Sequence, residues 1–118
     1  MTARYFQVLE DLLDEAMVKV RVVDGWVENE TECESVLRMK MMKNSLEFIY
    51  KRIGQQEHRI EEHTGYLVDT AEGTIRSDRV QRKVWECLVV CEHLIETQMA
   101  KKVEENKHKI IKTEASRL

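Results

Sequence analysis

The sequence contains no proline and only four glycines among 118 residues, and aromatic side chains make up 6% of it. Turns between many short strands usually draw on proline and glycine, so this scarcity argues against a β-sandwich or a β-barrel. No run approaches the roughly 20 consecutive apolar residues that a membrane span requires. The acidic, amphipathic start of the chain fits neither a signal peptide nor an arginine-rich transit peptide. We therefore expect a cytoplasmic protein, with a nuclear location still open.

Charge is abundant and unevenly distributed. Charged residues make up 35% of the chain and hydrophobic residues 42%, a composition that suits long amphipathic helices in one domain. The net charge of −3 gives no overall attraction to nucleic acid or to an anionic membrane. Residues 1–35 hold nine acidic and three basic side chains, whereas residues 77–118 hold seven acidic and nine basic ones. We expect the acidic first helix to lie beside the more basic other helices, within one chain or between chains.

The first part of the chain carries a helical pattern. A heptad stripe predicts a helix over about residues 3–24. A competing pattern occupies residues 17–27, where valines alternate with charged residues and Asp24-Gly25 suits a hairpin turn. The helix is favoured because the stripe crosses these residues unbroken; a stop at about Asp24 and continuation past Gly25 both stay open. The stripe consists of Phe6, Leu9, Leu13, Ala16, Val20, Val23 and Val27.

The second helical pattern is the longest and predicts a helix over about residues 32–64. Thr31 with Glu34 three residues later has the pattern of a capping box, and Gly65 suits the left-handed position that ends a helix. A helix of about 33 residues spans roughly 50 Å, and this length, with the three-and-four period, points to coiled-coil packing. Gln56 is a polar residue on the apolar stripe, a position that commonly fixes helix register.

A loop and a third helix follow. Residues 65–77 lose the helical period and are predicted to form a loop, with a short turn around Gly73. Ser77 or Asp78 can cap a helix over about residues 78–115. Its apolar stripe shifts by one residue midway, a stutter that locally unwinds a supercoil. The stripe consists first of Val80, Val84, Cys87, Cys91 and Leu94, and then of Ile95, Met99, Val103, Asn106 and Ile110.

The sequence offers little catalytic or metal-binding chemistry. Cys87 and Cys91 share one helical face, but the nearest histidine, His93, lies about 200° round the helix from Cys91, so the three cannot converge on one ion. Three cysteines, two of them in an apolar run, suit reduced buried thiols. No nucleophile motif or glycine-rich phosphate loop is present. We expect a protein that is not an enzyme and needs no metal or cofactor.

Basic side chains cluster around the expected start of the third helix. A basic helix can contact phosphates, so a small nucleic-acid-binding regulator is the alternative function. Interspersed acidic residues and the overall acidity favour an ordinary solvated helix face instead. The possible nucleic-acid contacts are Arg76, Arg79, Arg82 and Lys83.

The final tripeptide, Ser116-Arg117-Leu118, is open to two functional interpretations. It is similar to a peroxisomal address, and it also fits the C-terminal pattern that carboxylate-capturing domains bind. A chance match of three residues is the remaining interpretation.

Three apolar stripes predict an all-α protein, an antiparallel three-helix bundle or coiled coil with two long helices, in one domain over residues 1–118. The second and third helices should extend beyond the end of the first, and the apolar residues on these extensions must then be covered by another helix. We therefore expect a helical protein–protein interaction module, an adaptor or assembly subunit. Its partner would be a second copy, giving a homodimer, or another helical protein. The predicted interaction seam consists of Met39, Met42, Leu46, Ile49, Ile53, Ile60, Leu94, Met99 and Val103.

Overall fold

The computed structural model describes residues 2–29, 35–61 and 65–117, and the side chains of residues 3–107 within these ranges. The described residues form three helices, α1 (Thr2–Glu28), α2 (Val36–Ile60) and α3 (Ser77–Arg117). A β-hairpin of two short strands, β1 (Leu67–Thr70) and β2 (Gly73–Arg76), connects α2 to α3. The prediction of a largely helical chain is confirmed, and the hairpin is an addition to it.

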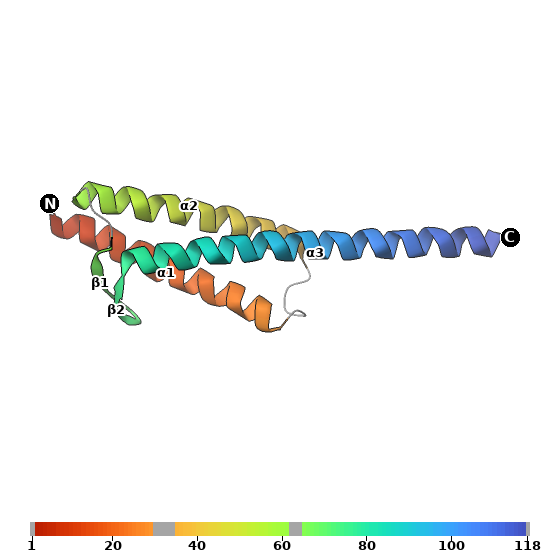
Figure 1. The fold of residues 1–118 in the computed structure, drawn as a ribbon, viewed down its shortest axis with the longest axis horizontal. Coiled ribbons are helices and arrows are strands. Elements are labelled where there is room, and N and C mark those ends of the chain that lie inside the picture. Colours follow the sequence, from red (N-terminus) through yellow and green to blue (C-terminus); the bar gives the residue numbers. More distant parts are fainter. Residues whose placement is uncertain (1, 30–34, 62–64, 118) are drawn as a thin grey trace.

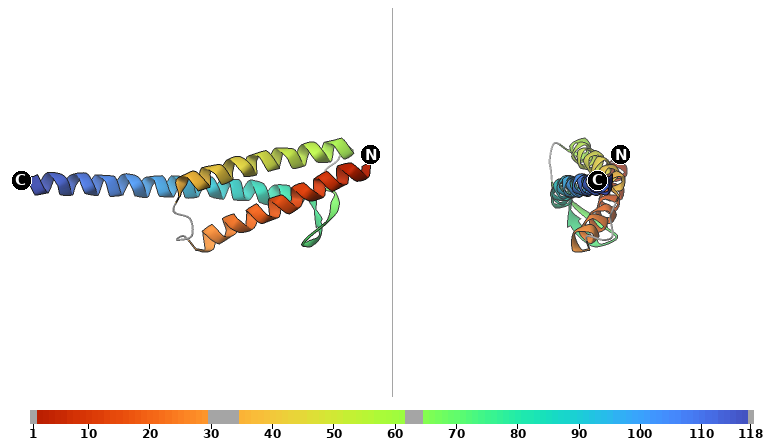
Figure 2. Two further views of the ribbon diagram at one scale, coloured as in Figure 1. Left: turned by 180° about the vertical axis from the view of Figure 1, so that it is seen from behind. Right: turned by 90° about the vertical axis from the view of Figure 1, so that its right-hand side faces the viewer.

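The helices lie side by side, with α1 and α3 pointing one way and α2 the other (Figure 1). α3 has 41 residues against 27 in α1 and 25 in α2, so it is about 20 Å longer than either. It therefore continues alone beyond the other two helices, and the molecule measures 75 × 23 × 17 Å (Figure 2). The expected overhang of the second helix does not exist, because α2 is shorter than α1.

Side chains from all three helices and from β1 fill one apolar core. Most of the core residues are the ones that the helical stripes predict. The buried apolar residues include Leu9, Leu13, Ala16, Val20 and Val23 of α1, Met39, Leu46, Ile49 and Ile53 of α2, and Val80, Val84, Cys87 and Cys91 of α3.

α1 remains helical through residues 17–27, so the alternative hairpin there and the stop at about Asp24 are both wrong. The physical reason is tertiary packing. Trp26 is only 5% exposed and belongs to the core, which holds the last turn in the helix despite Gly25. Asn29 N donates to Gly25 O at 2.9 Å and extends the helical bonding past the glycine.

α2 is bounded by residues inside the predicted range. Ser35 is its N-cap, and its hydroxyl accepts from Arg38 N at 3.3 Å. Glu61 is the C-cap, in an extended conformation. The capping box predicted at Thr31 and Glu34 lies outside the described residues.

Two residues within α2 fit its neighbours closely. Gly54 lies against α3: a Cβ atom there would be 3.0 Å from the Gln81 amide, which donates to Tyr50 O at 3.1 Å. Gln56 is 3% exposed, and its Nε2 donates to Tyr5 O of α1 at 2.9 Å. Gln56, the polar residue among the apolar ones of α2, therefore fixes the position of α2 against α1 within the chain.

The segment predicted as a loop over residues 65–77 contains the hairpin. Its antiparallel register runs from Leu67 opposite Arg76 to Thr70 opposite Gly73. Strands of four residues are too short to show a clear alternation of apolar and polar side chains, and the turn residues, Ala71 and Glu72, lack the Asn-Gly signal of tight hairpins. The sequence pattern therefore did not predict the hairpin.

Contacts with distant residues hold the hairpin against the helices. Val68 is buried in the core, and the Tyr66 ring packs edge-on against Phe6 of α1, with the ring centroids 5.5 Å apart. Ala71 N donates to the Asp14 carboxylate at 3.0 Å. Long-range contacts of this kind leave no mark on the local sequence pattern.

A buried carboxylate joins α2, the hairpin and α3. Glu57 is fully buried, and its Oε2 accepts from Ser77 Oγ and from Gly65 N, each at 2.8 Å. Ser77 Oγ in turn accepts from Tyr66 N at 2.9 Å. Gly65 has a φ of +82°, the left-handed conformation predicted for it, but it lies beyond the Glu61 cap and leads into the hairpin.

Replacing Ser77 with alanine should therefore destabilise the protein. The variant removes a hydroxyl that donates to buried Glu57 and accepts from Tyr66, so we expect a loss of about 1–3 kcal/mol in the free energy of unfolding, measured with urea. Thr97→Ala is the matched control, because its hydroxyl donates to His93 O in an exposed position, and its effect should stay below about 0.5 kcal/mol. Equal effects of the two substitutions would contradict the role given to Glu57.

Candidate interaction surface

The structure separates the nine predicted seam residues into two groups. Seven lie within the chain: four are buried in the core, and three, namely Met42, Ile60 and Leu94, pack half-buried against it. The remaining two, Met99 and Val103, are 48% and 53% exposed on the free half of α3. Only these two are placed to contact another molecule, and substitutions of buried residues such as Leu46 or Ile53 test folding rather than assembly.

Met99 and Val103 continue a row of exposed apolar side chains on α3. We call this row the α3 stripe; it consists of Trp85, Val89, Met99 and Val103, each about half exposed. At 3.6 residues per turn, all four point within about 40° of a common direction, and the row is about 27 Å long. Such a row is the surface that a partner helix covers in a coiled coil.

The α3 stripe begins beside α2 and ends on the free half of α3. The Trp85 ring packs against Tyr50 of α2, with the ring centroids 5.3 Å apart. In the middle of the row, Glu92 lies 3.2 Å from Lys43 of α2. Beyond Gln98, every side chain from Met99 to Lys107 is exposed.

Sequence reasoning missed Trp85 and Val89 as surface residues. A three-and-four spacing does link them to Met99 and Val103, but it passes through Glu92 and Glu96. Those two acidic residues hide the apolar row from a search for continuous hydrophobic periodicity.

The four predicted nucleic-acid contacts lie together, where β2 meets α3, and all are exposed. Arg76 is held by two hydrogen bonds to Asp78, at 3.0 and 3.1 Å, which lower the pKa of that carboxyl. Lys83 lies 3.8 Å from Asp24 of α1. Neither Arg79 nor Arg82 forms an ion pair with a described residue.

The pair of cysteines in α3 belongs to the core. Cys87 and Cys91 are 2% and 0% exposed, and neither forms a disulfide with a described residue. Burial raises the pKa of the Cys87 thiol, and the Asp24 carboxylate adds to the rise. Within the described ranges, no group of three His, Cys, Asp or Glu side chains is placed to hold a metal ion.

Comparison of the chain with family models, with curated proteins and with solved structures finds no match. Among the described residues, no helical stretch has both the length and the apolar character of a membrane span.

Both α3 thiols should resist a thiol reagent in the folded protein. In a Cys33→Ser variant, we expect Cys87 and Cys91 to react with Ellman's reagent only as fast as the helices open, since burial excludes the reagent and disfavours the thiolate. A cysteine placed at Lys101, which is exposed, should react at once in the same background. Immediate reaction of the native pair would contradict the packing of α3.

Proposed function

We propose that the protein is a non-enzymatic helical interaction module, an antiparallel three-helix bundle that assembles with a second copy through the α3 stripe. The observation that carries this proposal is the free half of α3. It continues a row of half-exposed apolar side chains past the point where α1 and α2 end. Apolar side chains arranged with coiled-coil spacing on an isolated helix gain free energy when a second helix removes them from water.

An antiparallel arrangement of the two copies covers the whole α3 stripe. If Met99 of one copy packs against Val103 of the other, the symmetry axis passes near Lys101. The end of each α3 then reaches the partner bundle at the level of Trp85, so each stripe is covered along its length. The two bundles lie at opposite ends, which avoids a clash between them.

Charge also favours the antiparallel arrangement. Glu96 of one copy then faces the turn of the second copy that holds Asn106 and Lys107. In a parallel arrangement Glu92 and Glu96 would each face their own counterparts, and like charges across a helical seam are destabilising.

The substitutions Met99→Glu and Val103→Glu, made together, should abolish self-association. Both would place a carboxylate in the apolar contact, so we expect the dimer dissociation constant to rise about a hundredfold or more. Light scattering at two well-separated concentrations gives the mass. The fold should be retained, because both side chains are exposed on the free half of α3.

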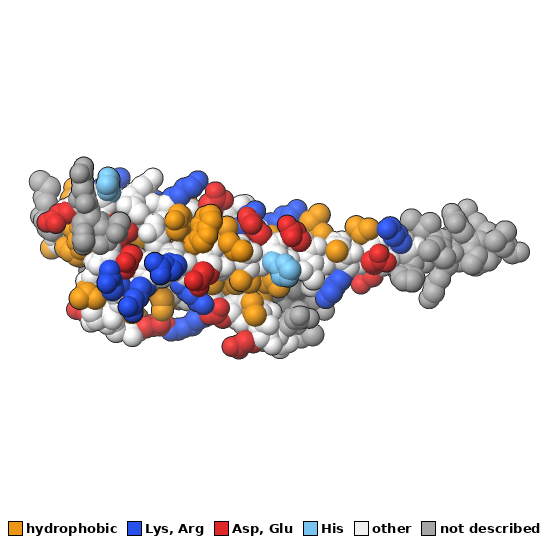
Figure 3. Space-filling view, viewed as in Figure 1, with side chains coloured by type: hydrophobic (Ala, Val, Ile, Leu, Met, Phe, Trp, Pro, Cys, Tyr) orange, Lys and Arg blue, Asp and Glu red, His pale blue; other side chains and the backbone are white. Residues whose placement is uncertain are grey.

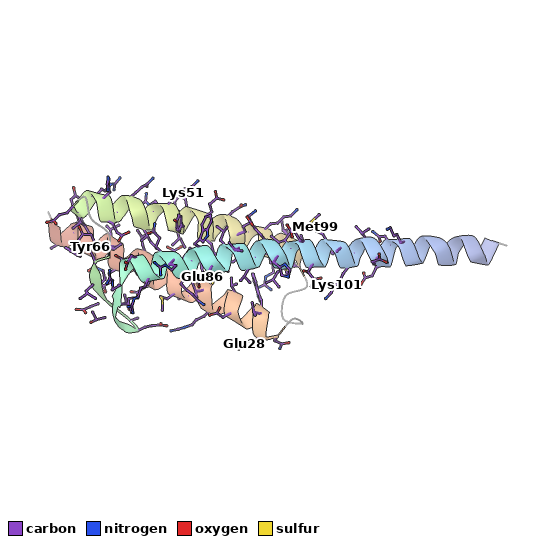
Figure 4. All side chains as sticks on the ribbon, in the orientation of Figure 1. Glu28, Lys51, Tyr66, Glu86, Met99 and Lys101 are labelled. Atoms are coloured by element: carbon purple, nitrogen blue, oxygen red, sulfur yellow. The ribbon has the colours of Figure 1, made fainter. Side chains whose placement is uncertain are left out.

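Lys101→Glu is the matched control. It changes the net charge by the same amount as the double substitution, but Lys101 lies on the opposite side of α3 from Met99 (Figure 4). It should leave the dimer intact. A native chain that is monomeric at all concentrations, or equal weakening by both variants, would overturn the proposal.

A further inference from the structure

A second surface lies at the opposite end of the molecule from the free half of α3. It is a pocket of about 400 Å³ in the corner between β2, α1 and the first turns of α3, and we call it the corner pocket. Four apolar residues line it: Met17 of α1, Leu67 and Ile75 of the hairpin, and Val80 of α3. Leu67 is 69% exposed and adds apolar surface beside the pocket.

The rim of the corner pocket is basic. Arg76, Arg79 and Lys83 line it, and no acidic side chain does. Lys and Arg side chains gather where the hairpin meets the helices (Figure 3). The contact of Lys83 with Asp24 is long and solvent-exposed, so it contributes little. Arg79 has no ion pair with a described residue, and it and Lys83 can therefore bind an incoming anion.

The corner pocket follows one edge of the hairpin. Thr74, Ile75 and Arg76 are successive residues of β2, and all three line the pocket. Leu67 of β1 is the register partner of Arg76, so Leu67, Thr74 and Arg76 share one face of the hairpin. Ile75 lies on the other face and extends the pocket to the edge of β2. The sheet formed by the described residues contains only β1 and β2, which leaves this edge of β2 without a strand partner.

The main chain of β2 offers hydrogen-bonding groups at this edge. Ser77 N donates to Tyr66 O at 2.8 Å, which makes Tyr66 and Ser77 a hydrogen-bonded pair. Antiparallel pairs alternate between hydrogen-bonded and non-hydrogen-bonded types, so the N–H and C=O of Thr74 and the N–H of Arg76 point away from β1, whereas the Arg76 C=O lies at the start of α3. An extended polypeptide can add to such an edge as a third strand.

We propose that the corner pocket binds an extended acidic segment of a partner protein. The segment adds a strand to β2, places alternate apolar side chains against Ile75 and Val80, and directs carboxylates to Arg79 and Lys83. This activity is separate from self-association, because Lys83 lies about 160° round α3 from Trp85, so the corner pocket and the α3 stripe occupy opposite faces of that helix.

Nucleic acid fits the same surface less well. The cluster from Arg76 to Lys83 covers only about 10 Å along the chain, room for one or two phosphates, whereas duplex binding usually neutralises several. A charged phosphate backbone gains no favourable contact from the apolar lining of the pocket.

The test measures binding of short dye-labelled peptides by fluorescence anisotropy. The host is the Met99→Glu/Val103→Glu protein, so the result is independent of self-association. A peptide with alternating Glu and Val should bind, and Arg79→Glu with Lys83→Glu should weaken it about tenfold or more. The matched pair Lys40→Glu with Lys51→Glu, exposed on α2, should leave the affinity unchanged.

Two further probes separate the features of the proposal. The same peptide with alternate main-chain nitrogens methylated should bind weakly, because it cannot pair with β2. A Lys-Val peptide should not bind. Failure of the Glu-Val peptide to bind, or no loss with the Arg79/Lys83 variant, would overturn the proposal. So would tighter binding of a single-stranded oligonucleotide or of phosphatidylserine vesicles, either of which would assign the site to phosphates.

Discussion

α1 and α2 are each about 20 Å shorter than α3 and can bury only its first half. This mismatch decides which part of α3 the chain leaves uncovered. Up to Ile95, α3 contributes side chains to a shared core; beyond Gln98 every described side chain is exposed. Because Met99 and Val103 continue the row begun by Trp85, the second half of α3 has an apolar face that the chain itself does not cover.

The opposite end of the molecule is organised by polar contacts. Glu57 is fully buried and bonds to both Gly65 and Ser77, so the last turn of α2 fixes the entrance and the exit of the hairpin. That arrangement places β2 beside the first turns of α3 and forms the corner pocket. The two proposed surfaces thus depend on different parts of the structure, an apolar row on one helix and a hydrogen-bonded junction between elements. The two proposed surfaces would let one copy of the chain contact two partners at once.

Heptad spacing was sufficient to predict the helices and most of their buried face, because residues such as Leu13 and Leu46 recur with the period of the core. Local signals failed where distant residues decide the structure. Gly25 stays helical because Trp26 is buried in the core. The hairpin is held by contacts between residues far apart in the sequence, such as Tyr66 with Phe6. The α3 stripe was predicted only in its second half, since Glu92 interrupts its apolar pattern. The basic cluster was visible in the sequence, whereas its apolar pocket required the fold.

The distance between the two copies of α3 tests the central claim most directly. A nitroxide label at Lys101→Cys, in a Cys33→Ser background, lies near the proposed symmetry axis and on the side of α3 away from Met99 (Figure 4). Pulsed electron paramagnetic resonance should then find one distance, roughly 30 Å, set by two helix axes about 10 Å apart and the two outward labels. No dipolar coupling between copies, or only distances well beyond that range, would contradict pairing of the free halves of α3.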